Sequence, residues 1–174
     1  MSKKIINLNL ATSDINGIIR ELNAYKQDLQ NKINIYRKRI ATELATQASL
    51  RFSNSIVSDV IKGGASRKAE VVVSISEIGS TTIVMANGDD AIWCEFGAGV
   101  YHNGSVGSSP HPKGTELGFT IGSYGKGYGK GKAWGYYDNG SLVITRGTPA
   151  TMPMYNAMIE VMRKALAIAQ EVFV

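Results

Sequence analysis

Cysteine is almost missing from this sequence of 174 residues, in which Cys94 stands alone. A lone cysteine cannot form an internal disulfide, and it cannot supply the several thiolates of a structural zinc site. Long apolar runs are missing as well: no stretch of about 18 apolar residues occurs, so no helix is expected to span a membrane. The opening residues 1–10 are too short and too mixed for a secretory signal peptide. These absences predict synthesis in a reducing cytoplasm.

Neither sign of charge dominates, since 19 Lys and Arg residues face 14 Asp and Glu residues and leave a formal charge of +5. This mildly basic balance permits contact with nucleic acid or with an acidic partner and requires neither. The hydrophobic fraction of 44% is enough for a buried core, which excludes a wholly disordered chain. At this length, residues 1–174 are expected to form a single domain.

One long helical pattern fills the first third of the chain. A short alternating segment over residues 6–10 is typical of a strand, and helix-capping side chains follow at residues 12–14. The pattern then predicts a helix from Asp14 to about Ser58, stopped by Gly63–Gly64. Its apolar positions recur at steps of three or four: Ile15, Ile18, Leu22, Tyr25, Leu29, Ile33, Tyr36, Ile40, Leu44 and Ala48.

Such a helix is too long for its own domain. It would extend about 65 Å, whereas a compact chain of this size has a radius of gyration of only about 16 Å. Two alternatives follow. Either the helix bends or breaks near residues 46–54, or part of it rests on another chain.

Two β-hairpins are expected after the helix. The first pairs an alternating segment over residues 70–78 with a β-branched segment over residues 81–86. Val73 and Ile75 are expected on one face of that hairpin, with serines on the other. The second hairpin runs from Trp134 to Ile144 around the turn residues Asn139 and Gly140.

Two further helices are expected. Asp89 or Asp90 can cap a short helix over residues 91–96, which Gly97 ends. The last helix begins at Pro153, because proline is favoured in a first helical turn, and apolar residues then recur at helical spacing to the end of the chain.

Glycine is concentrated in residues 101–140, which hold eleven of the nineteen glycines. The nearly low-complexity run at residues 122–132 has little to pack, so residues 101–132 are expected to form a glycine-rich extended loop. The whole pattern predicts the α+β class: an antiparallel β-sheet packed against one long N-terminal helix and a C-terminal helix, with this glycine-rich loop.

The Gly/Lys run lacks the spacing of a P-loop or of a dinucleotide-binding motif. What remains is three lysines, Lys126, Lys130 and Lys132, interleaved with Tyr124 and Tyr128. Such a segment can follow a nucleic-acid backbone, using charge for affinity and rings for stacking. It is also typical of a solvated loop, and the sequence alone favours that simpler interpretation.

Catalytic and metal-binding patterns are weak. His102 and His111 could ligate a metal together with Cys94, Glu95 or Glu116, but a histidine in a polar glycine-rich loop is usually solvated. Cys94 is expected to be a small packed residue, and no serine, histidine and aspartate arrangement stands out. We therefore expect no enzyme, no cofactor and no metal.

Two segments resemble a known family. Residues 93–97, Trp-Cys-Glu-Phe-Gly, resemble the E-F-G-T-G element of the small head–tail joining or tail-completion (neck) proteins of tailed bacteriophages. Residues 147–157 resemble that family's G-x-P-A-x-P-F element, with Met154 in place of the usual phenylalanine. The matching residues, which would fix loop geometry without touching a ligand, are Glu95, Phe96, Gly97, Gly99, Gly147, Pro149 and Pro153.

The resemblance implies a structural virion protein without catalysis, made in the host bacterial cytoplasm and located at the head–tail junction. It implies a homo-oligomeric ring, by family a hexamer, between the capsid connector or neck and the tail tube. Genomic DNA would pass through the channel, where Lys126, Lys130 and Lys132 could line it.

Two other functions stay open. The first is a sequence-nonspecific nucleic-acid-binding module that uses the basic Gly/Lys/Tyr loop. The second, a metal-dependent hydrolase built on His102 and His111, has the least support.

Overall fold

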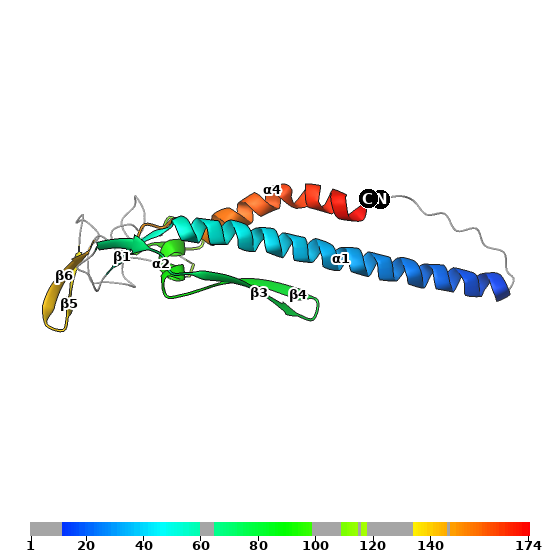
Figure 1. Ribbon diagram of the computed structural model, residues 1–174, viewed down its shortest axis with the longest axis horizontal. Coiled ribbons are helices and arrows are strands. Elements are labelled where there is room, and N and C mark those ends of the chain that lie inside the picture. The colour runs from blue at the N-terminus through cyan, green and yellow to red at the C-terminus, as the bar shows by residue number, and fades with distance from the viewer. Residues whose placement is uncertain (1–11, 60–64, 99–108, 115, 118–133, 146) are drawn as a thin grey trace.

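The computed structural model describes residues 12–59, 65–98, 109–114, 116–117, 134–145 and 147–174. Figure 1 shows an elongated molecule built along one helix, α1 (Thr12–Asn54). Helix α4 (Pro153–Phe173) lies antiparallel along one side of α1, and the hairpin of β3 and β4 lies along another side. The strand predicted over residues 6–10 and most of the glycine-rich loop over 101–132 lie outside the described residues.

Helix α1 runs unbroken for 43 residues, a length of about 65 Å. The long helix is therefore confirmed, and the bend or break near residues 46–54 does not occur. The helix ends at Asn54 because serines satisfy its last carbonyls: Ser53 Oγ donates to Leu50 O at 2.8 Å and Ser55 Oγ donates to Arg51 O at 3.0 Å. The expected extension to Ser58 is wrong.

Within the described residues the strands form three separate antiparallel hairpins, so the predicted α+β class with antiparallel strands is confirmed. The first, β1 (Ile56–Asp59) with β2 (Ala65–Lys68), was not expected from the sequence. The other two are β3 (Val72–Ile78) with β4 (Thr81–Asn87), and β5 (Trp134–Asp138) with β6 (Ser141–Thr145). Within the β3–β4 hairpin Val73 is paired with Ala86, and both pack against the core beside α1.

The core is small and lies at one end of the molecule. Its buried residues are Ala48, Phe52, Val57, Cys94 and Ala157, which come from α1, β1, α2 (Asp90–Phe96) and α4. Partly buried residues such as Leu44 and Met154 pack around it. Much of α1 therefore lies outside the region in which the elements converge.

A partly buried ion pair fixes α2 against the β1–β2 hairpin. Arg67 donates to both carboxylate oxygens of Asp90, at 2.6 and 3.0 Å, and the backbone N–H of Glu70 donates to the same carboxylate at 2.9 Å. The expectation that an aspartate side chain caps α2 is wrong, because Asp89 at the N-cap makes no capping bond and Asp90 binds Arg67 instead. Gly97, with φ 79°, ends α2 as expected.

Charged side chains border the α1–α4 contact. Arg51 pairs with Glu160 at 2.5 Å, Arg39 with Glu171 at 2.5 Å, and Lys164 with Glu43 at 2.7 Å. The hydrogen bonds from Lys164 lower the pKa of both Glu43 and Glu160. These pairs link α4 to α1 along their antiparallel contact.

Candidate assembly interface

The two segments that resemble the phage family meet in space. Glu95, at the end of α2, is buried and faces the start of α4. Its carboxylate accepts the backbone N–H groups of Met154 at 2.8 Å and Tyr155 at 2.9 Å. Pro153 has no N–H, and Met152 at the N-cap has no capping side chain. The Glu95 carboxylate, from another part of the chain, therefore serves as the acceptor for the N–H groups in the first turn of α4.

His111 completes this arrangement from a third segment. Its Nε2 lies 3.2 Å from Glu95 Oε1, while its Nδ1 accepts the backbone N–H of Lys113 at 3.1 Å. The Nε2 side of the ring therefore faces the carboxylate. The imidazole also contacts the rings of Phe96 and Tyr155, with centroid distances of 4.5 and 5.2 Å. The expectation that His111 is solvated is wrong, because it is buried.

Backbone pairing joins the same segments. Ala98 and Thr148 exchange two hydrogen bonds, of 2.8 and 3.2 Å, directly after Gly97 and Gly147. Gly147 has a φ of 81°, a region that favours glycine. We call this assembly of residues 94–98, 109–111 and 147–155 the motif junction. It holds Glu95, Phe96, Gly97, Gly147 and a buried Pro153, with Pro149 exposed at its edge, whereas Gly99 lies outside the described residues.

Cys94 is packed inside the motif junction, with no exposed surface. Burial and the nearby Asp90 carboxylate raise the pKa of the thiol to about 11. A thiol of that pKa is almost wholly protonated near neutral pH, so it is a poor nucleophile. The carbonyl of Cys94 accepts the N–H groups of Thr151 and Met152, which places this residue in a structural role.

The structure does not place the other predicted site residues. Lys126, Lys130, Lys132, Tyr124, Tyr128 and His102 lie outside the residues that the structure describes. In the described part of the chain no group of three or more His, Cys, Asp or Glu residues could hold a metal ion. No helix over the described ranges is long and apolar enough to cross a membrane.

The apolar stripe of α1 is only half covered. Helix α4 ends where Phe173 meets Tyr36, with ring centroids 5.9 Å apart, and the part of α1 before that point extends past α4 (Figure 1). We call residues 15–29 of α1 the α1 projection. Four of its large apolar side chains are exposed, between 40% and 51%: Ile15, Ile19, Leu22 and Tyr25.

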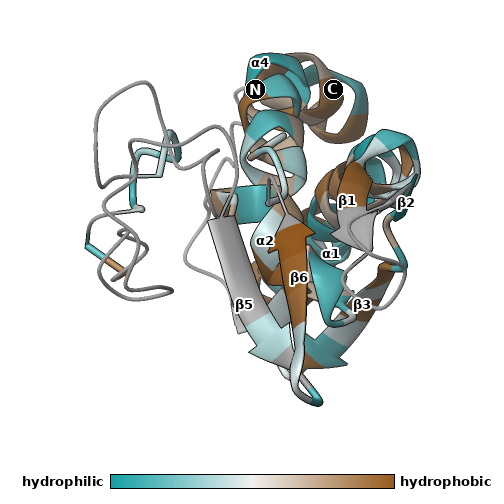
Figure 2. Ribbon diagram, turned by 90° about the vertical axis from the view of Figure 1, so that its left-hand side faces the viewer, coloured by the Kyte–Doolittle hydropathy of each residue, from teal (hydrophilic) through white to brown (hydrophobic). Residues whose placement is uncertain are grey.

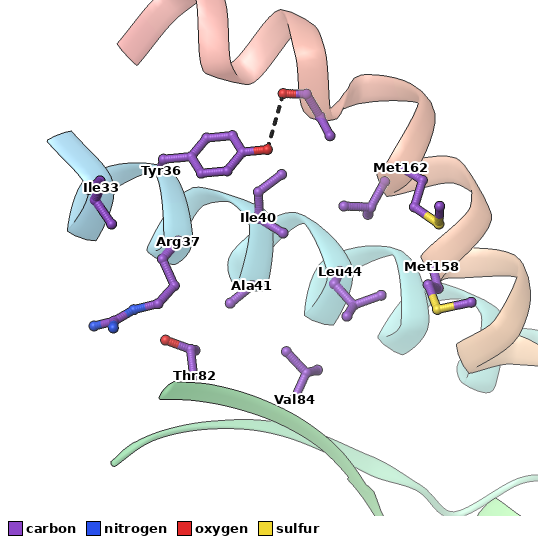
Figure 3. Close-up of a pocket in the computed structure, with 12 residues that line it drawn as sticks. Ile33, Tyr36, Arg37, Ile40, Ala41, Leu44, Thr82, Val84, Met158 and Met162 are labelled. Carbon is purple, nitrogen blue, oxygen red and sulfur yellow. Dashed lines mark hydrogen bonds between the residues drawn. The ribbon is translucent and has the colours of Figure 1, made fainter. Parts of the chain in front are cut away.

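An apolar groove begins a few residues beyond the α1 projection. It has a volume of about 520 Å³ and lies between α1, α4 and β4. Figure 3 shows Ile40 and Leu44 of α1, Val84 of β4 and Met158 and Met162 of α4 around it. Met158 is 42% exposed and Met162 is 65% exposed, so the groove is open to solvent.

The β5–β6 hairpin presents a third apolar surface. Tyr137 pairs with Leu142, and Leu142 and Ile144 share a face of β6. Tyr137, Leu142 and Ile144 are all exposed. Figure 2 shows the hydrophobic colouring of β6. An isolated two-stranded hairpin is only marginally stable in water, so this face is suited to contact with another surface.

Comparisons of the chain with protein-family models, curated proteins and solved structures found no match.

Proposed function

We propose that this chain is a structural virion protein of a tailed bacteriophage, which assembles into a homo-oligomeric ring at the head–tail interface. The observation that carries this proposal is the half-covered apolar stripe of α1. Large apolar side chains that are exposed in a row mark a surface made for contact. Under this proposal the chain has no catalytic step and needs no cofactor.

The α1 projection supplies part of the apolar energy that association requires. Burying the exposed half of a Leu or Ile side chain contributes about 1 kcal/mol, so the four exposed residues contribute about 4 kcal/mol to each contact. The groove and the β5–β6 hairpin add further apolar area. Repeated around a closed ring, contacts of this size support a stable assembly.

The motif junction supports the phage assignment. The two segments that carry the family resemblance are far apart in sequence, yet Glu95 of one holds the helix start of the other. The polar groups of the motif junction bind one another: the Glu95 carboxylate accepts two backbone N–H groups and faces His111. Such a junction fixes the direction of α4 relative to α2, as a subunit that must repeat its shape around a ring requires.

The proposed partners follow from the position in the virion. The ring would contact the connector or neck protein on one side and the tail tube protein on the other, and genomic DNA would pass through its channel. The lysines at positions 126, 130 and 132 would face that channel or a neighbouring ring.

The test measures mass and DNA binding together. Sedimentation of the purified chain is expected to show a discrete oligomer that persists in high salt, because apolar contacts are not screened. Electron microscopy of that oligomer should show a ring with a central channel. A chain that stays monomeric, or that binds DNA tightly with an affinity falling steeply with salt, would contradict the proposal and favour the nucleic-acid-binding alternative.

A further inference from the structure

We propose that the α1 projection of one copy inserts into the apolar groove of the next copy. The inference rests on the proposed self-assembly and names the two surfaces that make its contact. The occupant is therefore a second copy of this chain, presented as an amphipathic helix.

The spacing of the α1 projection suits this mode of binding. Helices that lie in apolar grooves use anchors at steps of three and four residues, and the exposed Ile15, Ile19, Leu22 and Tyr25 follow those steps. From Ile15 to Tyr25 the helix rises about 15 Å. The α1 side of the groove runs from Ile33 to Leu44, which is about 16 Å. Helix and groove are matched in length.

The groove cannot receive the projection of its own chain. Tyr25 and Ile33 belong to the same unbroken helix, and about 12 Å of rigid helix separates them. A straight helix cannot turn back onto its own flank. Filling the groove with this helix segment therefore requires another copy.

The chemistry of the groove fits an apolar helix face. Its lining is almost entirely aliphatic, apart from Tyr36, Arg37 and Thr82, and Met158 and Met162 can adapt to the side chains that enter. At the edge, the Nε atom of Arg37 is buried and makes no hydrogen bond to any described residue. A polar group of the incoming helix could serve that atom, since buried polar atoms are normally bonded.

The symmetry of this contact favours a ring. Projection and groove are different surfaces, so when each copy meets two different neighbours the contact is heterologous, and one projection and one groove stay free until the chain of copies closes. A contact of projection with projection would instead be isologous and would stop at a dimer. A heterologous contact closes into a ring when the rotation between successive copies allows it, and forms an open filament when it does not.

The experiment uses two single variants of the full chain and their mixture. Leu22→Asp places a charge on the projection, and Met162→Asp places one in the groove. Each variant alone is expected to weaken assembly about a hundredfold, since an unpaired carboxylate would be buried at the contact. Mixed together, they retain one intact projection and one intact groove, so they should form a one-to-one dimer and nothing larger.

Matched controls lie on the same helices. Lys26→Asp changes an exposed residue off the stripe of the projection, and Leu166→Asp changes a 70% exposed residue of α4 outside the groove. Both should assemble as the wild type does. Because Leu22 and Met162 are at least half exposed, their variants should keep the wild-type helical content by circular dichroism.

A crosslink provides a second readout if either aspartate variant fails to fold. Leu22→Cys mixed with Met162→Cys should give a disulfide-linked dimer of the two chains under oxidation, whereas either variant alone should not. The buried Cys94 does not compete.

The outcomes separate this inference from the proposed function. A wild-type chain that never associates overturns both. A wild-type oligomer that tolerates both aspartate variants, or whose mixed variants give no dimer, overturns the inference and leaves the self-assembling protein standing. Loss of assembly in Leu22→Asp alone, with Met162→Asp unaffected, shows that the projection binds a different surface and also overturns it.

Discussion

The Glu95 carboxylate offers the most direct test of the motif junction. It accepts the backbone N–H groups of Met154 and Tyr155 at 2.8 and 2.9 Å and is 7% exposed. Glu95→Ala removes both bonds and leaves two partly buried donors without a partner. At about 1–3 kcal/mol for each orphaned group, the free energy of unfolding should fall by about 3–4 kcal/mol.

A graded series makes that prediction sharper. Glu95→Gln keeps one acceptor oxygen but turns an amide NH₂ toward the second N–H, so it should cost about half as much, about 2 kcal/mol. Glu77→Gln is the matched control, because Glu77 is exposed and makes only a surface pair with Lys38 at 3.4 Å. Its expected cost is below about 0.5 kcal/mol.

The assay is urea unfolding followed by circular dichroism, with linear extrapolation to water. All variants must be compared at one protein concentration, since association stabilises the folded chain. A Glu95→Ala variant within about 0.5 kcal/mol of the wild type, the range of ordinary surface substitutions, would refute the view that this carboxylate holds the start of α4.

Further predictions concern other parts of the fold. Gly88→Ala should lower the melting temperature by several degrees, because a Cβ would lie 2.4 Å from the Glu70 carbonyl oxygen, whereas Gly17→Ala in open space on α1 should raise it slightly. Cys94, with its raised pKa, should resist alkylation at pH 8 in the folded chain and react readily in urea; rapid labelling of the folded chain would contradict its burial. Lys164→Met should lower the melting temperature at neutral pH. Hydrogen bonding to Lys164 lowers the pKa of Glu160 in the folded chain below its ordinary 4.5, so this stabilisation is present above that pH and is lost as the pH falls below it. The difference in melting temperature between wild type and variant should therefore disappear in acid. A difference that stays constant with pH would show that the pairing is not its cause.

Periodicity predicted the long elements well. The three- and four-residue steps of α1 and α4 and the turn residues of two hairpins gave these elements to within a few residues, because each pattern is local. The β1–β2 hairpin was missed for a physical reason: Ile56, Val57, Val60 and Ile61 also follow helical spacing, so the pattern continued α1 past its true end. Only Ser53 and Ser55, which bind the carbonyls of the last turn, mark the stop.

The motif junction could be predicted only in part. The resemblance selected residues 93–97 and 147–157, but nothing local shows that Glu95 reaches a helix 59 residues further on, or that His111 joins them. One feature of the sequence pointed that way. A helix that starts at Pro153 after Met152 has no capping side chain of its own, so its first N–H groups require an acceptor from another part of the fold.

The central claim is that the α1 projection and the groove exist to be covered by other copies of the chain. Sedimentation velocity over a wide range of protein concentration tests it most directly. The account predicts one discrete species of several 18.7 kDa chains, unchanged in high salt. A single species at the monomer mass over the whole range, with the apolar surfaces exposed throughout, would contradict it.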